Sequence, residues 1–400
     1  MNFKPLAFVG AITIMGSANA SVAVWLDYAG FDSTIVTAWT NGGYSGGNAL
    51  TAGEILGIKN DVQTKLQSIY SGFTISFNQS NPGGVFETLR MGATTTTAGL
   101  YGQADRLDWR NKHKDDVADI YAANFDDMVL PGSFTRTQNL ERIKNALAGT
   151  AAHELGHNLG LQHYDPYGIA SIQAPSYGGI TGQQNNQIMA TGGTGLTSIR
   201  RGDPRAFGLA EKIKLEYAEE MTTTPGQTIA ETGAAHGSIG QAQLVTGNIL
   251  PITGTSAVNI TGQVAASGQV DFYRFEATAG SLLSANAQSQ ILEIATAAQV
   301  DSIITLHDST GAVLVTNDDI SYSGNSFMQG TGTYGTDSLI QNFVATYTGT
   351  YYVSLSGFQT DTGSYELLLT GMNPVPEPAT MAALGAGVLW MARRRRAKKS

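Results

Sequence analysis

The chain contains no cysteine among its 400 residues. This absence excludes disulfide scaffolds, cysteine-based zinc sites, iron–sulfur clusters and thiol catalysis, so any metal must be held by His, Asp or Glu. Charged residues are also scarce, at 14%, while hydrophobic residues make up 42%. That balance fits a folded protein and argues against a long disordered acidic or basic chain.

Glycine, in contrast, is abundant: 48 of the 400 residues are glycine, well above the usual share of about 7%. So many glycines predict many turns and loops and argue against an all-helical architecture. At about 100 to 200 residues per domain, the chain should hold two or three domains.

The first 20 residues have the layout of a secretory signal peptide. Lys4 precedes an apolar run from Leu6 to Met15, and Ala18-Asn-Ala20 forms a small-residue cleavage site. The apolar run is too short to span a bilayer permanently. We therefore expect residues 1–20 to be removed on export; an ordinary buried N-terminal strand is the alternative.

The last residues, 372–400, combine three features in a fixed order. Val375-Pro-Glu-Pro378 is followed by an apolar stretch from Met381 to Ala392 and then by an Arg/Lys cluster. At about 1.5 Å per residue the stretch reaches roughly 20 Å, short of the ~30 Å hydrocarbon core, which makes it a marginal span. A nucleic-acid or nuclear-localisation role for the cluster is possible in principle. The apolar segment directly before it argues against that role.

This tail closely resembles the PEP-CTERM sorting signal of Gram-negative bacteria, with Pro376, Glu377 and Pro378 as the sorting motif. The resemblance implies recognition and cleavage near the motif by an exosortase-type enzyme. It also implies transient or retained anchoring in the inner membrane through the C-terminal segment, with delivery to the cell surface or extracellular matrix.

The two ends carry seven of the 23 Lys and Arg residues but only one of the 32 Asp and Glu residues. The body between them is therefore more acidic than the net charge of −9 for the whole chain indicates. Such a body should repel nucleic acid and can accommodate Ca²⁺. We expect no nucleic-acid partner.

Residues 21–220 predict a mixed α+β domain. Strand patterns cover 21–28, 73–77, 86–91 and 117–121, and helical spacing covers 51–70 and 206–220. A long helix is predicted from Thr137, a candidate N-cap, to Leu159, with a Gly/Gln/Ser-rich loop over 164–201.

The long helix carries a pattern of histidines that indicates a metal centre. His153 and His157 are four residues apart, so both imidazoles can meet one Zn²⁺ at about 2.0–2.1 Å. Gly160 permits a backbone turn that brings His163 in from a second direction. Three nitrogen donors leave a fourth position for water, and Glu154 can take a proton from that water. Amide hydrolysis is the natural reaction for this set.

The stretch from His153 to His163 matches the metzincin zinc signature without substitution, and Asn186-Gln-Ile-Met-Ala190 resembles the methionine turn of those peptidases. The resemblance implies a zinc endopeptidase domain over 21–220, a twisted mixed sheet with long helices. It assigns one catalytic Zn²⁺ to His153, His157 and His163, the general base to Glu154 and the turn residue to Met189. Several metzincin families have a tyrosine just after that methionine, and this chain does not, so transition-state stabilisation would depend on zinc and backbone donors.

A structural zinc site or a decayed enzyme is the alternative for these histidines. A closed structural site needs a fourth protein ligand, and Asp165 is the obvious nearby candidate. The other histidines, His113, His236 and His307, are expected to be ordinary surface or strand residues.

Residues 221–262 are rich in Thr, Gly and Ala and predict a linker. Over 263–371, seven short strands at roughly ten-residue spacing predict an all-β sandwich. This region resembles the bacterial pre-peptidase C-terminal domain through Asp271-Phe-Tyr-Arg-Phe275, Thr348-Gly-Thr-Tyr-Tyr-Val353 and Gly363-Ser-Tyr365. A candidate Ca²⁺ site consists of Asp301, Asp318, Asp319 and Asp337, which are equally well explained as turn-forming acids.

The sequence thus favours an exported zinc metalloendopeptidase that acts on peptide or protein substrates. The alternative is a non-catalytic surface or extracellular-matrix protein with a structural zinc domain and an adhesive β-sandwich. Glu154 favours the enzyme, because a non-catalytic zinc site has no need of a base.

Overall fold

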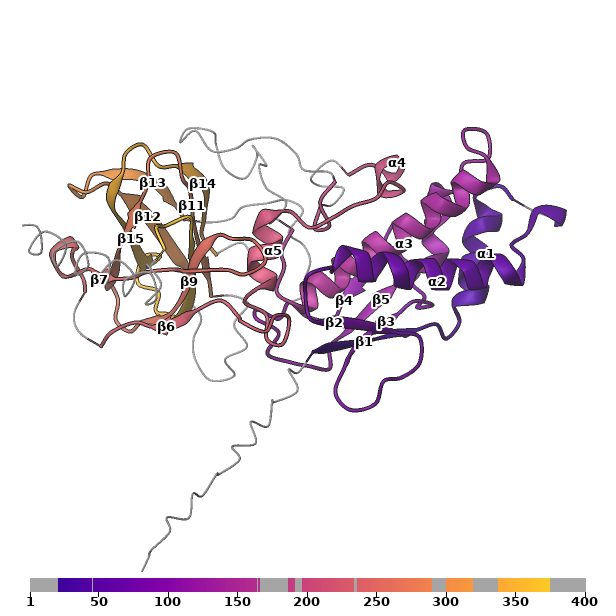
Figure 1. Cartoon of the computed structure of the whole chain (residues 1–400), viewed down its shortest axis with the longest axis horizontal. Coiled ribbons are helices and arrows are strands. Elements are labelled where there is room, and N and C mark those ends of the chain that lie inside the picture. The colour runs from indigo at the N-terminus through magenta and orange to yellow at the C-terminus, as the bar shows by residue number, and fades with distance from the viewer. Residues whose placement is uncertain are drawn as a thin grey trace, which may run out of the picture.

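The computed structural model describes residues 21–44, 46–163, 165, 186–190, 196–233, 236–289, 300–318 and 337–374. The predicted signal peptide (residues 1–20), Asp319, the apolar stretch over 381–392 and the sorting motif at Pro376, Glu377 and Pro378 lie outside these residues. Within the described part, no helix has the length and apolar character needed to cross a membrane. A mixed α/β unit is followed along the chain by a β-rich unit (Figure 1).

The first unit is organised around a five-stranded sheet with the order β2-β1-β3-β5-β4. Four strands are parallel, and the short edge strand β4 runs antiparallel to β5. The strands are β1 (Val22–Asp27), β2 (Ile75–Asn78), β3 (Glu87–Arg90), β4 (Gly102–Ala104) and β5 (Val117–Ile120). The four strands predicted from the sequence are all present, whereas β4 was not predicted.

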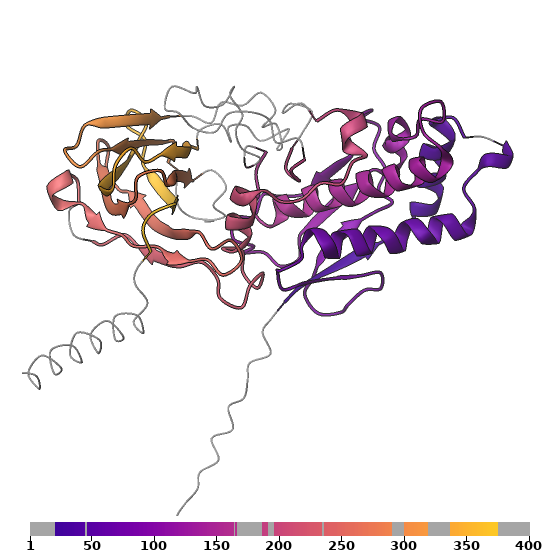
Figure 2. The ribbon, with the colours of Figure 1, turned by 45° about the horizontal axis from the view of Figure 1, so that its top comes forward.

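Three helices accompany this sheet: α1 (Phe31–Asn41), α2 (Ala52–Ile69) and α3 (Arg136–Asn158). Figure 2 shows α2 and α3 running side by side. Thr51 caps α2 together with Glu54, and Thr135 caps α3 together with Gln138. The N-cap of the long helix is therefore Thr135 and not Thr137, because Thr135 is extended and its hydroxyl accepts the backbone N–H of Gln138.

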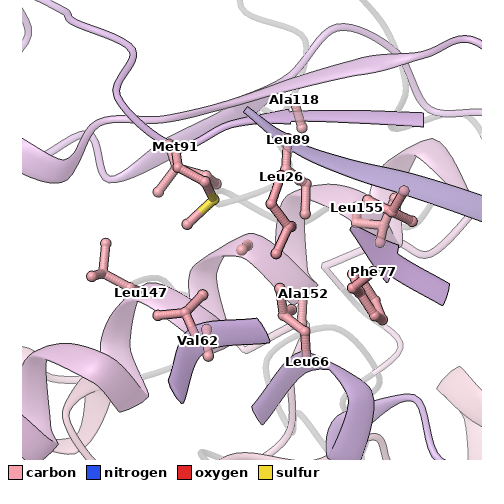
Figure 3. Close-up of a cluster of buried hydrophobic side chains, with 14 of the residues drawn as sticks. Leu26, Val62, Leu66, Phe77, Leu89, Met91, Ala118, Leu147, Ala152 and Leu155 are labelled. Atoms are coloured by element: carbon pink, nitrogen blue, oxygen red, sulfur yellow. The ribbon is translucent and has the colours of Figure 1, made fainter. Parts of the chain in front are cut away.

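The core of the first unit lies between the sheet and the helices (Figure 3). Leu26 and Leu89 of the central strands meet Val62 and Leu66 of α2 and Leu155 of α3, and all five are fully buried. Every residue of α3 from 145 to 158 is buried. A helix enclosed in this way holds its side chains in fixed positions, which suits it to carry a site.

The helix predicted over 206–220 is shorter in the structure, where α5 spans Leu209–Leu215. After it the chain tightens, since the N–H groups of Tyr217 and Ala218 bond to carbonyls three residues back. Glu216 then turns its carboxylate to the N–H groups of Ile252 and Thr253. A further short helix, α4 (Ser198–Arg201), ends the predicted loop.

The second unit consists of two β-sheets with the orders β13-β12-β15-β10-β7 and β14-β11-β16-β9-β6, and β8 also pairs with β9. All seven predicted strands are present. The strands are β6 (Thr228–Ala230), β7 (Gln243–Leu244), β8 (Asn248–Ile249), β9 (Ser256–Val264), β10 (Val270–Ala277), β11 (Leu282–Gln288), β12 (Ser302–His307), β13 (Val313–Asn317), β14 (Leu339–Val344), β15 (Gly349–Gly357) and β16 (Gly363–Thr370).

The predicted linker over 221–262 is wrong in this respect: much of it belongs to the second unit. The strand β9 begins at Ser256 and pairs with β16 from Ala257 to Val264, while β6 pairs with β9. Its pattern of buried residues runs unbroken from Ser256 to Ile260, as in a strand covered on both faces. The low aromatic content of this segment suggested a linker, but small residues can also fill a strand that is covered on both faces.

The two units pack directly against each other. Trp109 donates its indole N–H to Glu366 of β16 at 2.7 Å, and Arg110 lies 3.3 Å from the same carboxylate. A small apolar cluster joins both units; its members are Leu107, Trp109, Ile213, Tyr217, Leu250, Ala257 and Leu368. The β-rich unit thus packs against α5 and against the loop before β5.

Candidate functional site

Three histidines meet at the C-terminal end of α3. The Nε2 atoms of His153 and His163 lie 3.0 Å apart, those of His157 and His163 3.0 Å, and those of His153 and His157 3.2 Å. Two nitrogens at about 2.0–2.1 Å from one tetrahedral ion would lie roughly 3.3–3.4 Å apart. The spacing of this histidine triad therefore fits a single metal ion.

Hydrogen bonds fix the tautomers of two of these rings. Nδ1 of His153 lies 2.8 Å from the carbonyl of Ile188, and Nδ1 of His157 lies 2.8 Å from the carbonyl of Leu161. A carbonyl only accepts, so each Nδ1 carries the proton and each Nε2 presents a lone pair. Burial, strengthened by the neighbouring imidazoles, lowers the pKa of both rings well below the usual value. Neutral rings with facing lone pairs are the donor set of a cation site.

Gly160 brings the third histidine to the other two. Its φ is +91°, and its N–H bonds to the carbonyl of His157 at 2.8 Å, which ends the helix. A β-carbon at this position would lie 2.9 Å from Cα of Trp109 and 3.0 Å from the carbonyl oxygen of Asp108. Only glycine combines this conformation with this close approach.

Glu154 lies beside the triad, at the junction of α3 and β4. Its Oε2 accepts the backbone N–H of Ala104 at 3.0 Å, and the residue is only 6% exposed. Burial raises the pKa of this carboxyl to about 8, against the opposing effect of the Ala104 hydrogen bond. A group with this pKa can accept and release a proton near neutral pH.

Met189 lies beneath the helix that carries the triad. It is fully buried, and its N–H donates to Oε1 of Glu211 at 2.7 Å. A β-carbon at Gly156 would lie 2.9 Å from Sδ of Met189, so the glycine lets the methionine approach α3. The turn also holds His153 in place, since the carbonyl of Ile188 accepts a hydrogen bond from Nδ1 of this histidine.

Two arginines at this site were not predicted from the sequence. Arg205 is buried and donates to the carbonyl of Ile188 at 3.0 Å, beside His153, and burial lowers its pKa to about 9. Arg201 lines the cleft, with Cζ 4.3 Å from the ring centroid of Tyr101. Burial lowers the pKa of Arg201 as well. No local spacing in the sequence indicated either position, because both depend on the fold of the segment after Met189.

A cleft of about 480 Å³ opens over the triad. It is lined by His153, Glu154 and His163, by Arg201, and on its other side by residues in and before β4: Thr95, Thr97, Gly99, Leu100, Tyr101, Gly102 and Gln103. The cleft is large enough for an extended segment of a substrate, and it brings the histidines and the carboxylate into one space.

Asp165 does not join the triad. Its carboxylate lies 2.7 Å from Nζ of Lys214 and accepts the N–H of Gln162 at 2.7 Å, and it is 2% exposed. Among the described residues, the groups able to hold a metal comprise the triad and one other cluster, and Asp165 is in neither.

The candidate calcium residues are not gathered into such a group where the structure describes them. Asp337 is buried and accepts from Ser289, and the backbone N–H of Asp301 donates to Asp361. Asp318 lies near β13, and Asp319 is outside the described residues. Turn and strand-end contacts of this kind favour the alternative that these acids are structural.

The three remaining histidines differ from one another. The ring of His307 contacts the carbonyl of Gly311 and Oγ of Ser354, as expected of a strand residue. His113 uses its backbone N–H to bond Asp108. The expectation for His236 is wrong, because this residue is 6% exposed and lies between two carboxylates.

Comparisons with known families match the second unit and the tail. Residues 269–357 match the bacterial pre-peptidase C-terminal domain, and residues 374–396 match the PEP-CTERM protein-sorting motif. The chain is therefore an exported protein that carries a pre-peptidase C-terminal domain. Its sorting motif directs it to the cell envelope and implies processing by an exosortase.

The solved structures that are similar to about a third of the chain include the following two. One is a periplasmic inhibitor of g-type lysozyme from Aeromonas hydrophila, at 10% identity over 33% of this chain and 99% of the other, with a TM-score of 0.21. The second is the pre-peptidase C-terminal domain of a collagenase from Bacillus anthracis, at 15% identity over 32% and 93%, with a TM-score of 0.21. No curated protein matches the chain.

Proposed function

We propose that the protein is a zinc-dependent metalloendopeptidase of the metzincin type, exported and sorted to the cell envelope. The observation that carries the proposal is the convergence of three imidazole Nε2 atoms within 3.0–3.2 Å of one another, beside a buried carboxylate in an open cleft. His153, His157 and His163 would hold the ion. Zinc in this position supplies a Lewis acid for the scissile carbonyl and a water whose pKa falls towards ~7.

The residues of the chain divide the proton chemistry among them. Glu154 accepts the proton of the attacking water and returns it to the leaving amine, so the amide nitrogen departs neutral. The N–H of Ala104 holds the carboxylate in position during both transfers. The carbonyls of Ile188 and Leu161 keep two histidines in the tautomer that donates through Nε2.

The position of the edge strand β4 is a reason to propose a peptide substrate. Among the described residues β4 pairs with β5 alone, and its other side faces the cleft. An extended peptide can bond to such an edge as an added strand, which positions a backbone amide without demanding a particular side chain. Arg201 adds a cation to the same cleft, where it can stabilise negative charge that develops on the carbonyl oxygen.

The alternative, a structural zinc domain in an adhesive surface protein, has less support. A closed structural site needs a fourth protein ligand, and the nearby carboxylate of Asp165 is bound to Lys214. The buried carboxylate of Glu154 is costly to maintain, because burial disfavours its charged form. A purely structural site gains nothing from it.

The test compares Glu154→Gln with Glu141→Gln, a matched change at an exposed position of the same helix α3. Both variants and the full wild-type chain are assayed for zinc content and for cleavage of quenched peptides and casein. We expect Glu154→Gln to keep its zinc and to lose about 10²–10⁴-fold in rate, with Glu141→Gln unchanged. Zinc-loaded wild-type protein that cleaves nothing across a broad peptide library would contradict the proposal.

A further inference from the structure

A second group of metal-binding side chains lies in the β-rich unit, far along the sequence from the histidine triad. This second cluster consists of Glu231, His236 and Asp271, whose ligand atoms all lie within 4.8 Å of one another. Glu231 directly follows β6, and its N–H bonds to the carbonyl of Thr261 in β9. The carbonyl of His236 accepts the N–H of Phe272, the residue after Asp271 in β10. Backbone bonds to two different sheets thus fix all three residues.

The distances in the second cluster are too long for hydrogen bonds. Nε2 of His236 lies 3.9 Å from Oε2 of Glu231, and Nδ1 lies 3.8 Å from Oδ1 of Asp271. His236 is 6% exposed, and its buried Nδ1 has no hydrogen-bond partner. An imidazole binds an ion through one nitrogen, and two ligands at about 2.1 Å from that ion lie up to ~4.2 Å apart. An ion bound by Nδ1 of His236 would therefore account for the 3.8 Å separation from Asp271, and a turn of the Glu231 carboxylate would complete the set.

The charge of the second cluster is also unbalanced. Asp271 is almost completely buried, Glu231 is half-buried, and among the described residues neither forms an ion pair with Lys or Arg. The hydroxyl of Tyr365 lies 2.9 Å from Asp271 and 3.2 Å from Glu231, but its single proton serves only one of them. Asp271 also accepts the side-chain N–H of Gln269 at 2.9 Å, but Gln269 and Tyr365 are both neutral donors. Two carboxylates thus lie beside one imidazole, and a divalent cation would balance their charge.

We propose that Glu231, His236 and Asp271 bind a second divalent ion of the zinc class. An imidazole nitrogen with two carboxylate oxygens suits Zn²⁺ and its transition-metal neighbours, whereas Ca²⁺ takes six to eight oxygen ligands. Glu231, the most exposed of the three, has room to turn its carboxylate towards the ion. The ion would link the segment entering the β-rich unit to β10 of one sheet and, through Tyr365, to β16 of the other.

Counting metal ions in the full chain tests this site independently of catalysis. Wild type, His157→Ala, His236→Ala and the double variant are stripped with EDTA, equilibrated with Zn²⁺, desalted and measured for zinc per chain. We expect two, one, one and none. His307→Ala is the matched control and should keep two, since the imidazole of His307 already contacts Gly311 and Ser354.

Melting in EDTA shows whether each metal-free variant is folded. Glu231→Gln provides a second, gentler variant at the exposed side of the cluster. It should retain the wild-type melting temperature in EDTA, and zinc should raise its melting temperature only as far as it raises that of His236→Ala, whose triad is intact. One zinc per chain in wild type, removed by His157→Ala alone, would overturn the second site while leaving the triad intact. So would two ions retained by His236→Ala, or a cluster that binds Ca²⁺ but not Zn²⁺. Two bound ions without peptide cleavage would overturn only the proposed function.

Discussion

Replacing Gly160 by alanine tests whether the turn after α3 builds the histidine triad. Alanine at a φ of +91° costs about 1–2 kcal/mol of backbone strain. Its β-carbon would lie 2.9 Å from Cα of Trp109 and 3.0 Å from the carbonyl oxygen of Asp108, both backbone atoms that no side-chain rotation can move. Such overpacking costs a further ~1–3 kcal/mol. Alanine recovers about 0.4–1 kcal/mol by restricting the unfolded chain.

The strain and the overpacking outweigh that gain, so we expect a net destabilisation of roughly 2–4 kcal/mol. For a unit of this size the melting temperature in EDTA should fall by roughly 5–15 °C. Zinc binding should weaken in addition, because relief of the contact with Trp109 shifts the segment that carries His163. Differential scanning calorimetry and zinc titration measure the two effects.

Gly84→Ala is the matched control, since Gly84 has a φ of +77° and no atom within 4 Å of an added β-carbon. It should show only the backbone strain of about 1–2 kcal/mol less the same unfolded-state gain, a net cost of roughly 0.5–1 kcal/mol, with unchanged zinc binding. If Gly160→Ala melted like Gly84→Ala and bound zinc as wild type does, the turn would not be what positions His163.

Two further predictions follow from single side chains. Burial, with the nearby Asp116 and Asp108, raises the pKa of Glu87 to about 9, so the folded chain keeps a proton that the unfolded chain releases near 4.5. The free energy of unfolding should therefore fall as pH rises from about 4.5 to 9. Glu87→Gln should stabilise the protein by roughly 3 kcal/mol at pH 7 but not at pH 4. A variant whose denaturant midpoint equals that of wild type at both pH values would refute this. Arg201→Ala should lower kcat/KM for peptides by at least about tenfold with zinc content unchanged, whereas Arg200→Ala, an exposed neighbour, should not; equal rates for the two variants would remove Arg201 from the cleft chemistry.

The long elements of the fold could be predicted because their patterns are local. Ile58, Val62 and Leu66 recur at helical spacing and so form one apolar face, and these are the residues that α2 buries. The seven later strands follow from short apolar runs between turns. The strand β4 could not be predicted, since Gly102-Gln-Ala104 has no strand pattern and is a strand only because β5 pairs with it. The helix α1 could have been found, because Phe31, Ile35, Ala38 and Trp39 repeat at helical spacing.

The sequence by itself determined the geometry of the histidine triad. Residues within one helix and in the turn that directly follows it have almost no freedom of relative placement. The spacing of His153, Glu154, His157 and Gly160 therefore already predicts where three nitrogens and a carboxylate meet. Tertiary structure alone decided the surroundings. It placed Ile188 and Met189 beneath the helix, brought Arg201 into the cleft, and joined Glu231 and His236 to Asp271 on a separate strand. These contacts connect segments tens of residues apart, and only the packing of whole sheets and helices determines which distant residues become neighbours.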